Sequence, residues 1–156
     1  MAQIPAPGTP APQFSLKRDG GGEVHLKDFT GRKLVLYFYP KANTSGCTKE
    51  AIAFNGLREA FEKADTAILG VSADSVPDQD TFKAKYDLQF PLASDEARQM
   101  LEAYGVWVEK NLYGRKYMGI ERVTLLIDRD GTVARTWPKV KVDGHAPEVL
   151  AAAQAL

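Results

Sequence analysis

The six-residue run Leu34–Tyr39 limits the possible folds of this chain more than any other segment. It reads Leu-Val-Leu-Tyr-Phe-Tyr, apolar or aromatic throughout, with Lys33 before it and Pro40 after it. A continuous run of this length is typical of a β-strand that is covered on both faces. Because proline has no amide hydrogen to donate to a neighbouring strand, pairing should end at Pro40. The chain therefore needs a sheet with a layer of structure on each side.

Other segments supply partners for this strand and the layers that cover it. Apolar patterns predict a short N-terminal hairpin (14–16 and 24–26) and strands at 66–72, 123–128 and 132–137. Helices are expected at about 46–63, 77–88 and 95–104, and from Pro147 onward. This order predicts an α/β (α+β) fold with a central mixed sheet flanked by helices. We expect a single domain over residues 1–156.

Composition narrows the classes of function. Lys plus Arg and Asp plus Glu both total 20, and this balance argues against a nucleic-acid or anionic-membrane partner. The single cysteine, Cys47, excludes a disulfide within the chain, and with only two histidines no metal site is expected. No cofactor, signal peptide or membrane-spanning segment is expected either. The low cysteine content favours a reducing compartment, and we expect the cytoplasm.

Cys47 is the residue whose surroundings indicate chemistry. It follows the loop that begins at Pro40, and it falls in the first turn of the next predicted helix. Amide groups in a first turn have no partners within the helix, and the helix dipole adds partial positive charge there. Both effects favour the thiolate, which is the nucleophilic form of cysteine.

The helix dipole alone is too weak to make an ordinary thiol reactive. Lowering a thiol pKa from about 8.5 to about 6 takes roughly 3.4 kcal/mol. A helix terminus typically contributes ~0.3–1 kcal/mol and at most ~2 kcal/mol. A reactive thiol at this place therefore needs a cation beside the sulfur. Arginine suits that place better than lysine, because it stays charged and carries a rigid fork of donors.

Several blocks of the sequence resemble the peroxiredoxin family. The spacing Pro40-x-x-x-Thr44-x-x-Cys47 is similar to the peroxiredoxin active-site signature, and the longer segment Phe38–Glu50 resembles the bacterioferritin-comigratory (PrxQ) branch. The resemblance continues in order through Val71–Ser75, Phe90–Leu92, Tyr104–Trp107, Tyr113–Ile120 and Arg122–Asp128. It covers nearly the whole chain and implies a thioredoxin-like fold.

The resemblance also implies a reaction and a role for each site residue. The protein would be a thiol-dependent peroxidase that reduces hydrogen peroxide and alkyl hydroperoxides in antioxidant defence and redox homeostasis. Cys47 would be the peroxidatic nucleophile, which peroxide oxidises to a sulfenic acid. Thr44 would hydrogen-bond the peroxide, and Pro40 would shield the sulfur from water. Arg122 would supply the positive charge and stabilise the transition state.

Two departures from the branch affect the expected mechanism. Ser45 stands where many members have proline. Ile52 stands where many carry a second, resolving cysteine, and none occurs at 83–87, where others carry it. A one-cysteine mechanism follows, in which an external thiol reduces the sulfenic acid. Thioredoxin, a glutaredoxin and a small thiol all stay open as that partner. The branch implies a monomer, with a dimer left open.

Each site residue also has a simpler interpretation. Taken alone, Cys47 is compatible with a small buried hydrophobe, Thr44 with a helix N-cap and Pro40 with the end of a strand. Arg122 alone would be a solvated charge at a strand end. The tyrosines and tryptophans are expected to pack, and 110–116 to form a solvated loop.

Two other functions stay open at this point. One is a thioredoxin-fold binding or chaperone-like module whose thiol does not turn over. The other is a cysteine-dependent hydrolase, which would need His25 or His145 in contact with Cys47.

Overall fold

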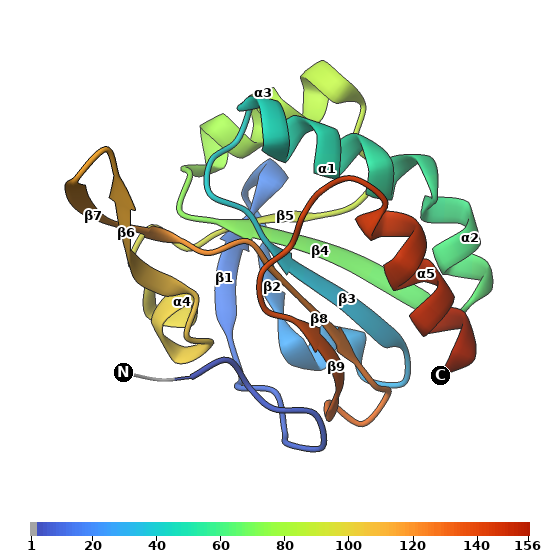
Figure 1. Ribbon diagram of the computed structural model, residues 1–156. Helices are drawn as coiled ribbons and strands as arrows, with labels where there is room; N and C mark the ends of the chain where they lie inside the picture. Colours follow the sequence, from blue (N-terminus) through green and yellow to red (C-terminus); the bar gives the residue numbers. More distant parts are fainter. Residues whose placement is uncertain (1–2) are drawn as a thin grey trace.

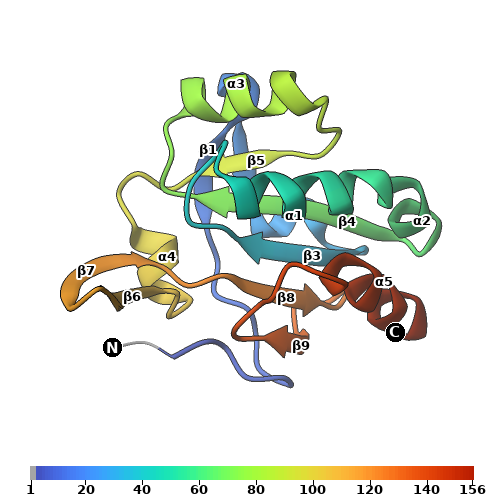
Figure 2. The ribbon, with the colours of Figure 1, turned by 45° about the horizontal axis from the view of Figure 1, so that its top comes forward.

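The structure, a computed structural model, describes residues 3–156 and contains one mixed seven-stranded sheet (Figures 1 and 2). The strand order is β2-β1-β5-β4-β3-β8-β9, with β3, β4 and β5 parallel and the other pairs antiparallel. The strands are β1 (Ser15–Arg18), β2 (Glu23–His25), β3 (Lys33–Phe38), β4 (Thr66–Ser72), β5 (Leu92–Ser94), β8 (Val123–Ile127) and β9 (Val133–Trp137). The predicted mixed sheet and N-terminal hairpin are confirmed.

Strand β3 lies in the interior of the sheet, between β4 and β8, and is buried along its whole length. Its side chains alternate between two core clusters, because successive residues of a strand point to opposite faces. Leu34, Leu36 and Phe38 belong to one cluster, whereas Val35, Tyr37 and, directly after the strand, Tyr39 belong to the other. The expected cover on both faces is confirmed.

One face of the sheet carries most of the helices. Helices α1 (Ser45–Gly56), α2 (Arg58–Lys63), α3 (Val76–Tyr86) and α5 (His145–Ala155) supply side chains to the cluster around Tyr37 (Figure 2). The short helix α4 (Gln99–Ala103) and the turn η2 (Leu26–Phe29) contribute to the opposite cluster. Within residues 3–156, no helix is long and apolar enough to cross a membrane.

The structure corrects three expected boundaries. The helix expected at 46–63 is broken at Leu57, directly after Gly56, a poor helix former. The helix expected at 95–104 begins only at Gln99, because the buried Asp95 carboxylate accepts the amide of Leu101 and so holds a turn ahead of the helix. Lys33, expected to flank the buried strand, lies inside it and donates from Nζ to the carbonyl of Ala153 at 2.6 Å.

A second sheet stands where a solvated loop was expected. Strands β6 (Trp107–Leu112) and β7 (Arg115–Ile120) form an antiparallel hairpin that projects from the body of the molecule (Figure 1). Tyr113 and Gly114 form its tight turn, both with positive φ (52° and 77°), as a type I′ hairpin turn requires.

Candidate active site

The sheet topology brings Cys47 and Arg122 together. Strand β3 ends at Phe38, and after a short loop α1 begins, with Cys47 as its third residue. Phe38 pairs with Val123 on the antiparallel strand β8, so Arg122 lies at the same edge of the sheet. There Arg122 Nη2 donates to Cys47 Sγ at 3.4 Å. The Cys47 side chain is buried, and the Arg122 side chain keeps 17% of its surface exposed.

Glu50 completes a buried charged group that the sequence analysis did not identify. A glutamate is seldom fully buried unless it is paired, and Glu50 is 1% exposed. Glu50 Oε1 accepts from Arg122 Nη1 at 2.7 Å, while the other arm of the same guanidinium reaches Cys47. The spacing of three residues from Cys47 to Glu50 was the available signal, because such residues share one face of a helix.

The Glu50 carboxyl lies in a poorly solvated place. Burial raises its pKa from 4.5 to about 7, and the Arg122 guanidinium opposes that rise. Glu50 Oε2 has no hydrogen-bond partner among the described residues. A carboxyl with one paired and one unpaired oxygen fits a group that holds a proton near neutral pH.

Thr44 and Pro40 lie on the loop between β3 and α1. Thr44 is the N-cap residue of α1 by position, but its hydroxyl does not cap the helix. The hydroxyl instead donates back across the loop to the carbonyl of Lys41 at 2.7 Å, so the expected N-cap position is confirmed but without a side-chain hydrogen bond to the helix. Because its proton is used in this way, the Thr44 oxygen is left as an acceptor. Pro40 lies just beyond the end of β3, and its side chain is partly buried.

Gly46 lets the guanidinium approach the start of the helix. A Cβ atom at this position would lie 3.2 Å from Arg122 Nη2, closer than ordinary van der Waals contact. Arg122 cannot yield freely, because Glu50 holds Nη1 and Cys47 lies against Nη2. The absence of a side chain at 46 is therefore part of the site's geometry.

Residues of helix α3 and at the end of β4 form hydrogen bonds that fix the loop between β3 and α1. Asp74 Oδ2 accepts the amide of Ala42 at 2.8 Å and the hydroxyl of Ser72 at 2.6 Å. Asn43, which has a positive φ of 62°, accepts at Oδ1 from Lys85 Nζ and Tyr86 Oη, both at 3.2 Å. These bonds fix the loop in the conformation that presents Cys47 to Arg122.

The histidines lie outside this group. His145 is buried, its Nε2 is 2.8 Å from Thr124 Oγ1, and burial lowers its pKa to about 4. His25 lies beside Glu23 and Asp28 on the N-terminal hairpin. Neither histidine hydrogen-bonds Cys47 within residues 3–156, so the contact that a Cys–His hydrolase needs is missing there. The same residues contain no cluster suited to hold a metal ion.

Known proteins resemble this chain over most of its length. The AhpC/TSA family matches residues 7–136. The putative peroxiredoxin Bcp of Coxiella burnetii is 50% identical over 143 residues, which are 92% of this chain and 95% of that protein. Peroxiredoxin Bcp of Bacillus subtilis is 46% identical over 143 residues, covering 92% of this chain and 91% of that protein.

Solved structures agree with these relatives. Peroxiredoxin Q of Xanthomonas campestris superposes with a TM-score of 0.87 at 48% identity, over 91% of this chain and 90% of that one. A cysteine mutant of Xylella fastidiosa PrxQ superposes with a TM-score of 0.92 at 40% identity, over 97% and 96%. The expected thioredoxin-like fold is confirmed. The chain belongs to the AhpC/TSA family, in its bacterioferritin-comigratory (PrxQ) branch of peroxiredoxins, and is a thiol-dependent peroxidase with a single cysteine.

Proposed function

We propose that Cys47 is the peroxidatic nucleophile and that Arg122, Thr44 and Pro40 form the rest of the peroxide site. The contact of Arg122 Nη2 with Cys47 Sγ is the observation that carries this proposal. The thiolate attacks one peroxide oxygen, the O–O bond breaks, and the second oxygen leaves as hydroxide or alkoxide, which takes up a proton from the solvent to give water or an alcohol. Cys47 is then a sulfenic acid.

Arg122 has two tasks in this reaction. Its charge stabilises the thiolate, and its donors stabilise the negative charge that develops on the leaving oxygen. The bond to Glu50 fixes the plane of the guanidinium, so little reorganisation is needed when peroxide enters. Thr44 accepts the hydrogen bond of the peroxide O–H, because its own proton is already donated to Lys41. Pro40 shields the sulfur from water.

The substrates are hydrogen peroxide and alkyl hydroperoxides. A structure of the bacterioferritin comigratory protein of Xanthomonas campestris, 47% identical to this chain, addresses alkyl peroxide reduction by that protein. An external thiol completes the cycle, because the chain has no second cysteine. Thioredoxin, a glutaredoxin and a low-molecular-weight thiol are the candidates. We place the protein in the cytoplasm as a monomer.

The test is to follow the fate of Cys47 under peroxide. Without a thiol, mass spectrometry of the Cys47 peptide should show the gain of a single oxygen and no disulfide. With dithiothreitol present, the protein should turn over hydrogen peroxide. Cys47→Ser should keep the fold, as judged by circular dichroism, and lose both results. Equal peroxide turnover by Cys47→Ser would overturn the assignment, and hydrolysis of esters without a reductant would favour the hydrolase.

A further inference from the structure

The β6–β7 hairpin exposes an unusual amount of apolar surface beside the active site. Six large apolar side chains are exposed among residues 3–156, and four of them belong to this hairpin: Leu112, Tyr113, Tyr117 and Met118. Tyr113 is 99% exposed, which corrects the expectation that the tyrosines pack. A contiguous group of large exposed apolar side chains is typical of an interaction site.

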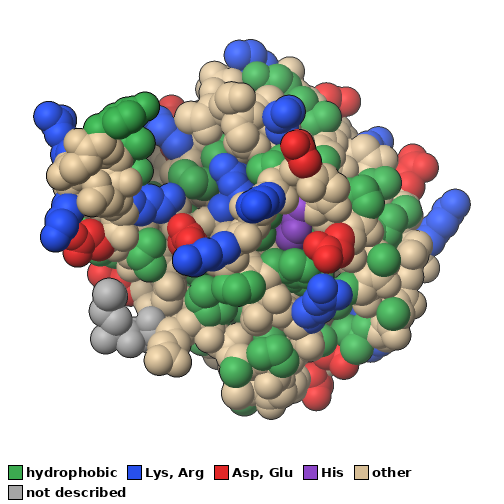
Figure 3. Space-filling model, in the orientation of Figure 1, with side chains coloured by type: hydrophobic (Ala, Val, Ile, Leu, Met, Phe, Trp, Pro, Cys, Tyr) green, Lys and Arg blue, Asp and Glu red, His purple; other side chains and the backbone are tan. Residues whose placement is uncertain are grey.

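One face of the hairpin combines this apolar surface with positive charge. Residues directly opposite each other in an antiparallel pair share a face, and the register pairs Lys110 with Tyr117 and Leu112 with Arg115. We call these four residues, with Tyr113 at the turn, the hairpin surface. Lys110 and Arg115 have no ion pair within residues 3–156, whereas the only acid of the hairpin, Glu109, pairs with Lys116. Figure 3 shows hydrophobic and basic side chains side by side where the hairpin projects.

The hairpin surface continues to the active-site loop. Lys110 and Tyr117 lie close above Gly119, within 3.4 Å of where a Cβ atom would stand. The same two side chains line a hollow of about 340 Å³ whose other wall includes Pro40 and Lys41 of the active-site loop. Strand β7 ends at Ile120, two residues before Arg122.

We propose that the hairpin surface docks the protein that reduces Cys47, and that this partner presents its thiol among acidic and apolar side chains. This inference rests on the proposed function, since only a sulfenic acid without an internal partner requires an outside thiol. Net positive charge on the surface calls for a negatively charged counterpart. A small thiol would leave the apolar side chains uncovered, whereas a protein partner covers about 800 Å² on each side.

A second copy of this chain fits the surface less well. In a two-fold dimer the same patch faces itself, so Lys110 and Arg115 of one copy would face the same two cations of the other. Like charges brought together in this way oppose association.

Reduction of the Cys47 sulfenic acid is balanced in atoms and electrons when the docked partner carries two thiols. One partner thiol attacks the sulfur of the Cys47 sulfenic acid, which forms a mixed disulfide and releases water. The second partner thiol then attacks the partner's own sulfur in that disulfide. The partner leaves as a disulfide, oxidised by two electrons, and Cys47 returns to the thiol.

The test compares two charge-reversal variants of equal net charge. Lys110→Glu/Arg115→Glu alters the hairpin surface. Lys27→Glu/Lys63→Glu alters exposed lysines on η2 and α2 and serves as the control. The probe is a bacterial thioredoxin kept reduced by its reductase, with dithiothreitol as a small thiol for comparison. Hydrogen peroxide consumption in a single turnover without reductant tests the proposed function separately.

We expect Lys110→Glu/Arg115→Glu to lower kcat/KM for thioredoxin at least about tenfold at low salt, with a smaller loss as ionic strength rises. Its turnover with dithiothreitol and its single-turnover oxidation should match those of the wild type. Three results would each overturn the proposal. The first is unchanged thioredoxin kinetics, and the second is an equal loss in the control variant. The third is that dithiothreitol reduces the wild type and thioredoxin does not. Single-turnover oxidation is also measured with a bulky alkyl hydroperoxide, and a loss confined to that substrate would overturn the proposal by assigning the surface to substrate instead. Failure of the wild type to consume peroxide at all would reject the proposed function itself.

Discussion

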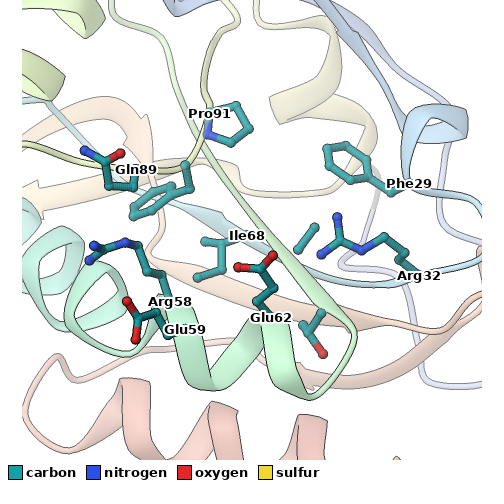
Figure 4. A pocket seen from close by; sticks show the side chains of 11 residues that line it. Phe29, Arg32, Arg58, Glu59, Glu62, Ile68, Gln89 and Pro91 are labelled. Carbon is teal, nitrogen blue, oxygen red and sulfur yellow. The ribbon is translucent and has the colours of Figure 1, made fainter.

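The active site and the hollow over the start of β4 both contain arginine and glutamate, but they arrange these residues differently. The hollow, about 430 Å³ in volume, has Arg32, Arg58, Glu59 and Glu62 along its rim (Figure 4). Its arginines find partners away from the space: Arg58 Nη1 donates to the carbonyl of Asn55, and Arg32 Nε lies 3.7 Å from Asp65.

At the active site the charged groups are buried and meet at one reactive atom. Arg122 spans Glu50 and Cys47 with the two arms of a single guanidinium. Desolvated charges interact more strongly than solvated ones, so this small group has the larger electrostatic effect. The comparison teaches that buried charged groups in contact with a nucleophile indicate an active site better than the volume of a hollow does.

The sharpest test of this contrast removes one arginine from each place. Arg122→Ala should slow the oxidation of Cys47 by hydrogen peroxide by about 10²–10³-fold, the range expected when a preorganised donor to a transition state is lost. Arg58→Ala should leave that rate unchanged. Stopped-flow measurement of single-turnover oxidation checks both. A loss below about threefold in Arg122→Ala would remove this arginine from the proposed mechanism.

Glu50 and Glu62 allow a second test, through the pH dependence of stability. The native pKa of Glu50 is raised from 4.5 to about 7, so its stabilising proton is fully bound below about pH 4.5 and is lost as pH rises through about 7. Urea unfolding should therefore show wild-type stability falling across this window, by up to about 3 kcal/mol more than in Glu50→Gln. Glu62→Gln should follow the wild type.

His145 acts in the opposite direction but does not disturb this comparison. Its native pKa is lowered to about 4, so its stabilising contribution is present above about pH 6.5 and is lost as pH falls toward about 4. Because His145 is present in the wild type and in both variants, its effect cancels in the difference. Parallel pH profiles for the wild type and Glu50→Gln would show that Glu50 ionises like an ordinary carboxyl.

A smaller effect is expected from a single methyl group at the helix start. Gly46→Ala should push Arg122 Nη2 from Cys47 by a few tenths of an ångström and lower the oxidation rate up to about tenfold. Gly56→Ala, on the same helix with open space around its Cβ position, is the matched control and should keep the wild-type rate. In an Arg122→Ala background, Gly46→Ala should have no further effect on the rate. Additive losses would show that Gly46 acts without Arg122.

The sequence predicts the parts of this molecule whose apolar pattern is strong. The run Leu34–Tyr39 indicates a strand covered on both faces, and the position of Cys47 after it indicates a thiol in the first turn of a helix. The need for an arginine beside the thiol also follows from energetics, and Arg122 occupies that place.

Other features depend on contacts that a local pattern does not contain. The buried Glu50 is paired with Arg122, which lies just before β8 and 72 residues further along the chain. The β6–β7 hairpin is exposed over most of its length, so its strands lack the alternation of a half-buried sheet. The direction of the Thr44 hydroxyl depends on the loop carbonyl of Lys41, which no side-chain pattern reveals.

The rate at which the reduced protein consumes hydrogen peroxide is the most direct test of an activated Cys47. It should be measured in a single turnover, against free cysteine in the same buffer and at the same pH. A site in which Arg122 donates to a buried sulfur should react several orders of magnitude faster than free cysteine. A rate close to that of free cysteine would contradict activation by this geometry and would favour a binding module with an inert thiol.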